Sequence, residues 1–549
     1  MIRILVPLFS LSALLALPGC LPSKDTDPDD KETGDSDLDG DADTDADSDT
    51  DTDADSDTDT DTDTDTDTDT DTGEDRDGDG FTVSEGDCDD RDDAINPRAT
   101  EICDEVDNDC NELVDDDPVD GEEYPADRDG DGFGDAANTI ISCDMVVTNS
   151  FDCDDRDASE PVVVDQYNAG SSQDGTTANP YETIQQGIDD ADLCVAVYPG
   201  NYTETVDFTG KDIEVFSTSG AKNTIIDGGG AGSTVTFSSG ESAAAELRGF
   251  TITAGSGTVE TSTSSAACDS SSTCVTNYTR YYGGGIFVDG AAPTLRALMI
   301  TGNALAAYSY TEVSDTEDYY VYSYGGGMFV NNSRGMELMD VSFAVNYADQ
   351  GGALYVGDTA TVGVIQSRLG YNSAANGGAI TVAGGTLTVT NAVFVGNAAT
   401  GSGGALYADD GAVTWWNVTA ASNAGASGSG AAIMGSADFY FQSSVIAYGV
   451  GGAGVFLESS AASLDADYSD AYDNAGGNYG GVTAPTGSNG NLEFDPGFTA
   501  FTDDGVENDD FTLASGSALI NAGNPSASYN DTDGSRNDIG AYGGPDGGW

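Results

Sequence analysis

A six-residue pattern of the form Gly-Gly-x-apolar-x-apolar recurs in the second half of the chain with a spacing of 26 residues. It begins at Gly325, Gly351, Gly377 and Gly403. Apolar and polar residues alternate within each repeat, for example at residues 387–390, as is typical of short β-strands. A repeat too short to form a domain indicates stacked coils. The pattern therefore predicts an all-β protein built on a right-handed parallel β-helix.

Two polar positions also recur once per repeat. The repeats end at asparagines, whose side-chain amides we expect to bond to one another along the rod: Asn346, Asn372, Asn397 and Asn423. Six residues before each of them lies a second polar side chain: Asp340, Gln366, Asn391 and Asn417. We interpret this second line as turn residues with a structural role.

The two ends of the predicted coil carry different signals. Residues 180–188 have apolar side chains at helical spacing, which predicts a short amphipathic helix that covers the open end of the coil. Residues 195–228, 517–523 and 538–544 resemble the opening and closing segments of right-handed β-helix proteins of the pectin-lyase-like superfamily. This resemblance covers residues 165–549 and implies one β-helix domain, which we assign to residues 161–549.

The charge of the chain is extreme and unevenly distributed. The net charge is −83, and residues 39–72 are almost entirely Asp alternating with Thr, Ala or Ser. Such a segment cannot bury a core and repels itself, so residues 20–74 are predicted to be a disordered linker. The charge argues against nucleic acid as a partner and favours hard cations, although adaptation to high salt is an alternative. The chain has no histidine, which excludes Ser-His-Asp catalysis and His-ligated metals.

The N-terminus is predicted to be a signal peptide covering residues 1–19. Arg3 precedes an apolar run from residue 4 to residue 17, and residues 17–20 read Leu-Pro-Gly-Cys. This resembles the lipobox of bacterial lipoproteins, which implies that Cys20 is acylated and anchors the protein in a membrane. Leu21 follows the cysteine, so the resemblance implies the outer membrane, on its periplasmic or extracellular face.

Residues 75–160 are predicted to form an Asp-rich metal-binding module. Residues 75–81 and 127–133 both read Asp-Arg-Asp-Gly-Asp-Gly-Phe, the first half of an EF-hand loop, but Gly86 and Asn138 replace its bidentate Glu. With the cysteines and acids that follow, the segment resembles the metal-binding motif of Asp-rich bacterial surface proteins (MopE type) and, more loosely, thrombospondin type 3 repeats. Glu112 replaces the usual glycine of the motif, and the second copy is truncated.

The ligands of this module are predicted to be oxygen atoms. Some family names associate the motif with copper, but oxygen ligands without histidine favour calcium in a structural role. Simple exposed acidic loops are the alternative. The candidate ligands are Asp75, Asp77, Asp79, Phe81, Asp87, Asp89, Asp107, Asp109, Asn111, Asp127, Asp129, Asp131, Phe133, Asp135, Asp152 and Asp154, with the two phenylalanines contributing backbone carbonyls.

Eight cysteines remain after Cys20, and an even number in an exported chain indicates disulfides. Cys268 and Cys274 flank a short loop and are predicted to pair. Cys103 with Cys110, and Cys143 with Cys153, are plausible local pairs. Cys88 and Cys194 then remain, and their pairing is left open.

Two insertions interrupt the coils just before their glycine turns, at residues 255–282 and 304–324. Both end at equivalent points, so we expect them to lie side by side. They are rich in tyrosine, which is common at binding surfaces, although packing of the two loops on each other is the alternative. The candidate ligand-binding residues are Tyr278, Tyr281, Tyr282, Tyr308, Tyr310, Tyr319, Tyr320, Tyr322 and Tyr324, with Trp415 and Trp416 as a smaller candidate in a predicted strand.

An enzyme is the main alternative to a binding protein. Uronate lyases of this fold use calcium and an Arg or Lys base, but Arg296, Arg334 and Arg368 stand at different positions of their repeats. The sequence therefore favours a calcium-binding surface lipoprotein whose rod acts as an adhesin for a polysaccharide or a surface protein. The alternatives are a calcium-dependent polysaccharide lyase or glycoside hydrolase, and a passive envelope protein.

Overall fold

The computed structural model describes residues 73–130, 132–143, 147, 149–154, 156, 158, 160–268, 273–314, 317–458, 461–502 and 509–549. The chain divides into two compact units, Met1–Asp71 and Thr72–Trp549, and every described residue lies in the second. The predicted signal peptide, the lipidation site Cys20 and residues 20–72 of the linker lie outside the described residues. Within the described part, no helix is long and apolar enough to cross a membrane.

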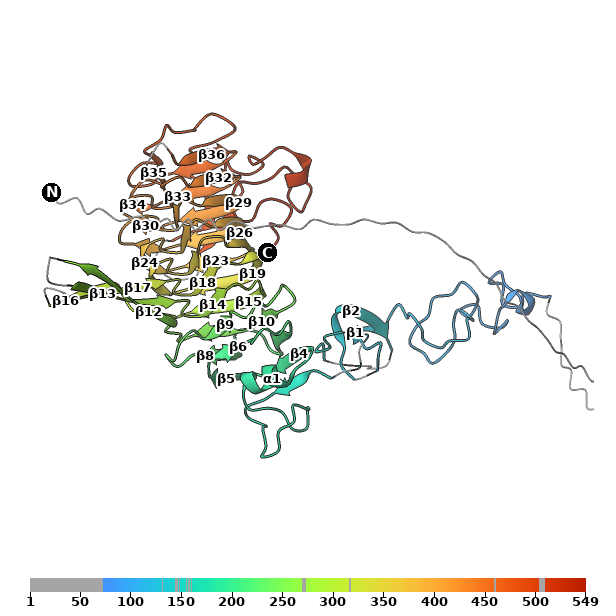
Figure 1. The fold of residues 1–549 in the computed structure, drawn as a ribbon. Helices are drawn as coiled ribbons and strands as arrows, with labels where there is room; N and C mark the ends of the chain where they lie inside the picture. The colour runs from blue at the N-terminus through green and yellow to red at the C-terminus, as the bar shows by residue number, and fades with distance from the viewer. Residues whose placement is uncertain are drawn as a thin grey trace, which may run out of the picture. The chain divides into compact units, whose positions relative to one another are not determined.

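The largest sheet runs the length of the β-helix, and its strands stack from coil to coil (Figure 1). This first sheet contains β3 (Val162–Val164), β4 (Cys194–Val197), β5 (Gly200–Thr203), β7 (Glu214–Ser217), β8 (Thr224–Asp227), β10 (Glu246–Arg248), β11 (Thr251–Thr253), β15 (Thr294–Thr301), β19 (Arg334–Ala344), β22 (Thr361–Ile365), β23 (Arg368–Gly370), β26 (Thr386–Val395), β29 (Ala412–Ala421), β32 (Asp438–Gln442), β33 (Val445–Ala447), β36 (Ser463–Asp467) and β37 (Asp470–Tyr472).

Two further sheets complete each coil. The second sheet contains β6 (Val206–Asp207), β9 (Val235–Phe237), β14 (Ile286–Asp289), β18 (Met328–Asn331), β21 (Leu354–Val356), β25 (Ile380–Ala383), β28 (Leu406–Asp409), β31 (Ala431–Met434), β35 (Val455–Leu457) and β38 (Tyr479–Gly480). The third contains β12 (Thr258–Ala267), β13 (Thr273–Tyr282), β16 (Ser309–Ser314), β17 (Glu317–Tyr324), β20 (Tyr347–Gln350), β24 (Ser373–Asn376), β27 (Ala398–Ala399), β30 (Ala424–Gly425) and β34 (Val450–Gly451).

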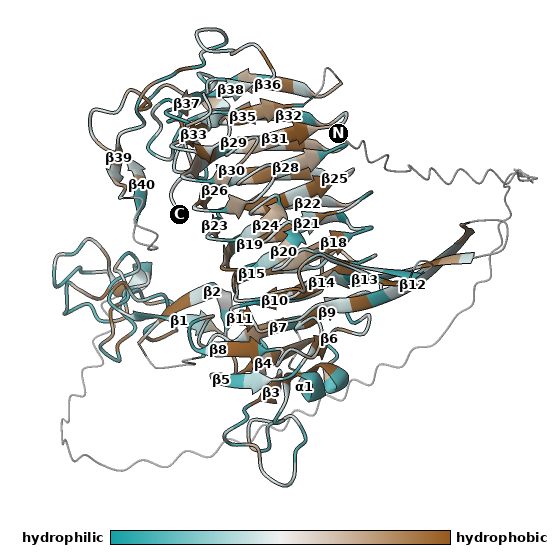
Figure 2. Cartoon of the chain, turned by 90° about the vertical axis from the view of Figure 1, so that its left-hand side faces the viewer, coloured by the Kyte–Doolittle hydropathy of each residue, from teal (hydrophilic) through white to brown (hydrophobic). Residues whose placement is uncertain are grey.

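The strands of successive coils pair in parallel and in the register that the repeat predicts. Leu354 lies opposite Ile380, and Ile380 lies opposite Leu406, each one repeat apart. The inward side chains of all three positions are fully buried in one continuous apolar core. Figure 2 shows this as hydrophobic residues concentrated in the stacked strands. The predicted fold class, a parallel β-helix preceded by a small disulfide-bonded acidic module, is confirmed.

The paired glycines of the repeat are explained by the turn they form. Gly325 has φ of +68°, a left-handed conformation that favours glycine. A Cβ atom on the next residue, Gly326, would lie only 2.5 Å from the carbonyl oxygen of Gly352 in the following coil. The first glycine therefore allows the turn and the second allows the close approach of neighbouring coils.

Asparagines form the predicted ladder along the rod. The Asn346 amide donates to Oδ1 of Asn372 at 3.0 Å, and Asn372 donates to Oδ1 of Asn397 at 3.0 Å. Asn397 donates to Asn423 in the same way at 2.9 Å, and Asn303 extends the ladder toward the N-terminus. All of these side chains are buried, so the ladder satisfies polar groups inside the wall of the rod.

The second polar line marks a turn in the first sheet, as predicted. Asp340, Gln366, Asn391 and Asn417 all have φ between +47° and +54°. The Asn391 and Asn417 amides also donate to backbone carbonyls of the C-terminal segment, at Ala541 and Asp538 respectively. That segment includes β39 (Phe498–Ala500), β40 (Asp510–Leu513) and the 3-10 helix η2 (Ala527–Tyr529). The line of turn residues therefore holds the C-terminal segment against the rod.

The helix α1 (Ile184–Asp190) packs on the first coil, which confirms the predicted cap. Thr183 and Gln186 form a capping box at its N-terminus, and Ile184 and Ile188 are fully buried. At its C-terminus the Lys211 ammonium donates to three backbone carbonyls at 2.7–2.8 Å. The helix thus covers apolar residues at the open end of the coil.

The two insertions form hairpins that project from the stack (Figure 1). Strands β12 and β13 pair antiparallel, as do β16 and β17, and β13 pairs in parallel with β17. The insertions therefore lie side by side, as predicted. We call this four-stranded extension the blade.

The disulfide pattern corrects part of the sequence analysis. Cys268 pairs with Cys274, as predicted. The local pairs Cys103–Cys110 and Cys143–Cys153 are wrong, because the observed bonds are Cys88–Cys110, Cys103–Cys143 and Cys153–Cys194. Cys88 and Cys194 therefore do not join each other. The turns of the module, which are closed by carboxylates, bring together cysteines that are 22 to 41 residues apart in the chain.

The module also contains a short 3-10 helix and a two-stranded sheet. The 3-10 helix η1 (Val83–Glu85) lies between two acidic turns, and β1 (Glu122–Ala126) pairs antiparallel with β2 (Asp135–Ser142). The Cys153–Cys194 bond ties the end of the module to β4 of the first sheet. Phe151 packs beside it on Phe216, with ring centroids 6.1 Å apart. A covalent and an apolar contact thus join the module to the β-helix.

Replacing Asp470 with Asn is expected to stabilise the protein above neutral pH. Burial, with the charges of Glu493 and Asp495, raises the pKa of Asp470 to about 7. The folded state therefore keeps a proton that the unfolded state releases, and stability falls as the pH rises from about 4 through 7. The loss is at most about 4 kcal/mol, since one pKa unit corresponds to about 1.4 kcal/mol.

Thermal unfolding of the two proteins at pH 5 and pH 8 tests this expectation. The Asp470→Asn variant should exceed the wild type in melting temperature at pH 8, and the difference should shrink at pH 5. Asp465→Asn, at an exposed position on the same side of the coil, is the matched control and should show no such pH dependence. A variant that is less stable than the wild type at pH 8 would contradict the prediction.

Candidate functional site

The two Asp-rich segments of the module fold into the same turn. The Asp75 carboxylate accepts hydrogen bonds from the backbone amides of Gly78 at 2.7 Å and Gly80 at 3.2 Å. Asp127 accepts from Gly130 at 2.7 Å and from Gly132 at 3.1 Å. The repeated sequence is therefore a repeated structure in which one carboxylate closes a glycine-containing loop.

Within the first turn, several carboxylates keep one oxygen for another partner. One oxygen of Asp77, Asp79 and Asp87 accepts from the backbone amide two residues ahead, at 2.8–3.2 Å. The other oxygen of each is buried and has no hydrogen-bond partner among the described residues. Burial, and then nearby carboxylates, raise the pKa values of Asp77 and Asp87. Buried unpaired oxygens are costly, and a hard cation with oxygen ligands would satisfy them.

The ligand atoms are also close enough for one ion. Oxygens of Asp75, Asp77 and Asp79 lie within 4.8 Å of one another. Asp87 is 3% exposed, and its carboxylate is near enough to Asp79 and Asp77 for their charges to help raise its pKa. The residues present therefore fit a metal site that draws on both the first turn and the segment after it.

A second group joins Asp107 and Asp109 to Glu101, which the sequence analysis missed. Glu101 is buried and accepts from the backbone amides of Asp109 and Asp115, both at 2.8 Å. Both oxygens of Asp107 accept backbone amides, while Oδ1 of Asp109 is buried without a hydrogen bond in the described structure. Glu112 has φ of +75°, which explains why the motif usually has glycine there.

The other predicted ligands are less clearly assembled. Asn111 Oδ1 accepts from the amide of Leu113, and Asp152 accepts from the amide of Asp154 at 2.9 Å. Asp131 lies outside the described residues. By position in the repeat, Asp129 corresponds to Asp77. The remaining residues stay predictions: Phe81, Asp89, Phe133, which is half-buried, and Asp135, which accepts from the Asn138 amide.

A groove on the β-helix is the second candidate site. Outward side chains of the second sheet stand in register, with Phe287 opposite Phe329 and Phe329 opposite Tyr355. Their rings stack with centroids 5.6 and 5.3 Å apart. Beside this row, Tyr282 and Tyr324 of the blade stack at 5.5 Å. An aromatic surface therefore continues from the blade onto the rod.

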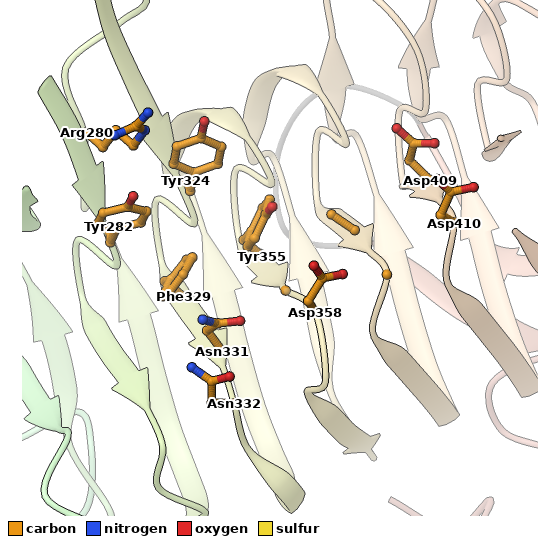
Figure 3. Close-up of a pocket in the computed structure, with 13 residues that line it drawn as sticks. Arg280, Tyr282, Tyr324, Phe329, Asn331, Asn332, Tyr355, Asp358, Asp409 and Asp410 are labelled. Atoms are coloured by element: carbon orange, nitrogen blue, oxygen red, sulfur yellow. The ribbon is translucent and has the colours of Figure 1, made fainter. Parts of the chain in front are cut away.

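This surface lines a cavity of about 510 Å³, which we call the groove (Figure 3). Its aromatic side is formed by Tyr282, Tyr324, Phe329 and Tyr355, and the opposite end is acidic. The polar lining residues are Arg280, Asn331, Asn332, Asp358, Asp409 and Asp410. Asp410 accepts from Ser436, and burial followed by the charge of Asp410 raises the pKa of Asp409. The groove can thus offer ring faces and hydrogen-bond acceptors to one ligand.

The predicted tyrosines divide between the two faces of the blade. Tyr282 and Tyr324 line the groove, and Tyr308, Tyr322 and Tyr324 line a second cavity beside it. Tyr278, Tyr310 and Tyr320 stack on one another along the same face, with ring centroids 5.0–5.6 Å apart. Tyr281 and Tyr319 alternate with these residues in register and lie on the other face. Some of the predicted tyrosines therefore pack on one another, and others line cavities, for which ligand binding stays a prediction.

The structure corrects the prediction for the tryptophan pair. Trp415 is fully buried in the core, where its ring stacks on Phe394 at 5.2 Å, so the structure does not support it as a ligand-binding residue. Trp416 points outward but stacks on Tyr529 of the C-terminal segment at 5.6 Å. The alternation of inward and outward side chains could have been predicted from the sequence. Val413 and Trp415 share the inward side of β29, while Thr414 and Trp416 share the outward side.

The sequence analysis missed several residues that line the groove or the second cavity. Phe329, Tyr355 and Tyr407 occupy the x between the two apolar positions of the glycine repeat. Because that position points away from the core, its aromatic residues were a signal for an outer surface. Asp358 and Asp410 follow just after β21 and β28, and Asp409 is the last residue of β28, so all three lie where the chain turns at the edge of the second sheet.

The coil arginines lie elsewhere. Arg296 faces Glu246 at 3.5 Å, and the Arg368 guanidinium lies 5.6 Å from the centroid of the Phe511 ring. Arg334 begins β19 of the first sheet. Of the described residues that line the groove, Arg280 is the one with a cationic side chain, and it comes from the blade.

Comparisons with known proteins matched one short segment of the chain and, more distantly, one solved structure. The family model for MopE-type copper-binding proteins, described as a metal-binding motif, matches residues 87–116, a small part of the chain. No curated protein matches the chain. Among solved structures, the crystal structure of the pectate lyase Pel9A matches with a TM-score of 0.37 and 14% identity, over 69% of this chain and 94% of that one. The matched motif lies in the acidic module, and the parallel β-helix follows it in the chain.

Proposed function

We propose that the protein is a calcium-binding surface protein whose β-helix holds a glycan in the groove. The aromatic row that runs from Tyr282 through Phe329 to Tyr355 supports this most directly. Ring faces give apolar contact to the carbon-bound hydrogens of a sugar, while nearby carboxylates and amides accept its hydroxyl groups. The row crosses successive coils, so it suits a linear chain of sugars, as an adhesin would require.

Calcium is the proposed metal of the acidic module. The buried oxygens of Asp77, Asp79 and Asp87 support it, because carboxylates without histidine or thiolate suit a hard cation better than copper. In the same proposal, an acyl chain on Cys20 anchors the protein in the outer membrane. The acidic linker then holds the folded part away from the lipid.

Binding of glycans by the full-length protein tests the groove. Titration against neutral, acidic and amino-sugar oligosaccharides with calcium present should identify at least one ligand. Tyr355→Ala should then weaken binding about tenfold or more, because a lost aromatic contact in a binding pocket costs on the order of 1.4 kcal/mol. Tyr167→Ala, at a tyrosine that is 74% exposed and outside the groove, is the matched control.

Two outcomes would overturn the binding proposal. Failure to bind any glycan while the circular dichroism spectrum shows an intact fold would favour a passive envelope protein. Formation of unsaturated or reducing sugar ends, abolished by a chelator, would instead favour the lyase or hydrolase alternative. In that case Arg280 is the first side chain to substitute, followed by Arg296, Arg334 and Arg368.

A further inference from the structure

The aromatic row of the second sheet is interrupted at Thr381. In register, the outward positions are Phe329, Tyr355, Thr381 and Tyr407. Thr381 is buried, and its hydroxyl donates to the carbonyl of Asn376 at 3.1 Å. Its short side chain therefore forms the base of the surface between the neighbouring rings. Tyr355 and Tyr407 therefore stand on either side of a gap in the row.

The gap is wide enough to hold a small group between two rings. Neighbouring strands are about 4.8 Å apart, so residues two strands apart are separated by roughly 10 Å. Carbon atoms in contact need about 3.5–4.0 Å, which leaves room for one group that touches both rings. The gap opens into the second cavity, of about 410 Å³, whose walls include Tyr308, Tyr322 and Tyr324 of the blade.

The charge of this cavity is negative. Asp349 accepts from the amides of Tyr308 at 2.7 Å and Ser323 at 2.9 Å, and from the Ser323 hydroxyl at 3.0 Å, so it fastens the blade to the coil. Asp409 lines the cavity half-buried and accepts no hydrogen bond recorded among the described residues. The described residues that line the cavity include no lysine or arginine. Asp409 therefore supplies a carboxylate that a cationic ligand can pair with.

The surroundings of Asp409 select the kind of cation. Calcium takes six to eight oxygen ligands, whereas this cavity offers mainly ring faces. Aromatic faces attract organic cations, and cages of such rings recognise alkylated ammonium groups. We propose that Tyr308, Tyr322, Tyr324, Tyr355 and Tyr407 form a cage for an alkylated ammonium ion, with Asp409 as its counter-ion. This inference goes beyond glycan binding and does not depend on it. The second cavity shares Tyr324, Tyr355 and Asp409 with the groove, but Thr381 and Tyr407 line the second cavity alone.

Calorimetric titration of the full-length, calcium-loaded protein with choline and tetramethylammonium tests the cage. The neutral isostere 3,3-dimethylbutan-1-ol has the same shape without the charge and is the ligand control. Choline should bind at least tenfold more tightly than the isostere. Equal affinities, or no binding of either cation, would overturn the proposal, and glycan binding that persists in that case would leave the proposed function standing.

Variants locate the site. Tyr407→Leu and Asp409→Asn should each weaken choline binding severalfold or more, and Asp409→Asn should also reduce its dependence on salt. Thr381→Tyr should abolish binding, since it fills the gap with the residue that the flanking coils already carry at this position. Tyr167→Leu, at the exposed tyrosine outside both cavities, is the control and should bind normally. Unchanged affinity in Tyr407→Leu and Thr381→Tyr would overturn the assignment.

The same chemistry occurs on free small molecules and on lipid headgroups. Co-sedimentation with phosphatidylcholine vesicles, compared with phosphatidylglycerol vesicles, separates these sources. Binding to the first vesicles that free choline displaces would support the cage and identify a headgroup as its ligand. Binding of free choline without sedimentation would support the cage and identify a soluble ligand.

Discussion

Removing calcium is expected to unfold the acidic module while the β-helix stays folded. The module buries few apolar side chains, and its turns are closed by carboxylates such as Asp75 and Asp87 rather than by a core. Without a cation, the like charges of these groups repel one another inside the turns. A site that is filled at 100 times its dissociation constant stabilises the folded state by about 2.7 kcal/mol, so two or more sites dominate the stability of this segment.

Differential scanning calorimetry of the full-length, disulfide-bonded protein measures this effect. A chelator should remove one transition or lower its midpoint by about 10 °C or more, which corresponds to a loss on the order of several kcal/mol. The transition of the β-helix should stay in place. Asp87→Asn should reproduce part of the shift, because it removes a buried ligand. Asp93→Asn, an exposed acid of the same segment, should not. Stabilisation by copper but not by calcium would contradict the proposed metal.

The repeat was predictable because its physical causes are local. A left-handed glycine, a second glycine against the next coil and an inward apolar position each leave a residue type in the sequence, as at Gly325, Gly326 and Met328. When such constraints recur at a fixed spacing, register follows from the spacing itself. The asparagine ladder was predictable for the same reason.

The disulfides and the two cavities depend on contacts that are distant in the sequence. Cys103 reaches Cys143 only because the turns between them fold back, and no local spacing encodes that path. The groove likewise forms where the blade meets the second sheet, which places the ring centroids of Tyr324 and Tyr355 5.2 Å apart. The tyrosines of the insertions were visible in the sequence. The sequence showed their partners on the rod only as outward positions of the repeat. Which of these positions line a cavity depends on where the blade lies.

Breaking the asparagine ladder at its centre is expected to destabilise the β-helix severely. The Asn372 amide donates to the carbonyls of Phe343 and Gly370, at 3.0 and 3.1 Å, as well as to Asn397. Its Oδ1 accepts from both the backbone and the side chain of Asn346 at 3.0 Å. Asn372→Ala removes all of these hydrogen bonds and leaves the buried backbone amide of Asn346 without its acceptor. A buried unsatisfied group of this kind costs about 1–3 kcal/mol.

The sum of these losses sets the expected magnitude. Because water can enter the space left by the side chain and reach some of these partners after relaxation, we expect Asn372→Ala to lower the free energy of unfolding by about 3–5 kcal/mol. Asn372→Asp should cost at least as much, since a carboxylate oxygen would then face the two carbonyls. Asn223→Ala, which removes a single hydrogen bond from an exposed side chain to the carbonyl of Ser219, should cost less than about 1 kcal/mol.

Denaturant unfolding followed by far-ultraviolet circular dichroism measures these differences. The ladder has one asparagine per coil, so a substitution at Asn372 interrupts bonds to the coils on both sides, whereas one at Asn423 lies near the end of the continuous run. The central variant should therefore lose more stability than Asn423→Ala. Equal and small losses at both positions would show that the backbone pairing of the sheets, and not the ladder, holds neighbouring coils together.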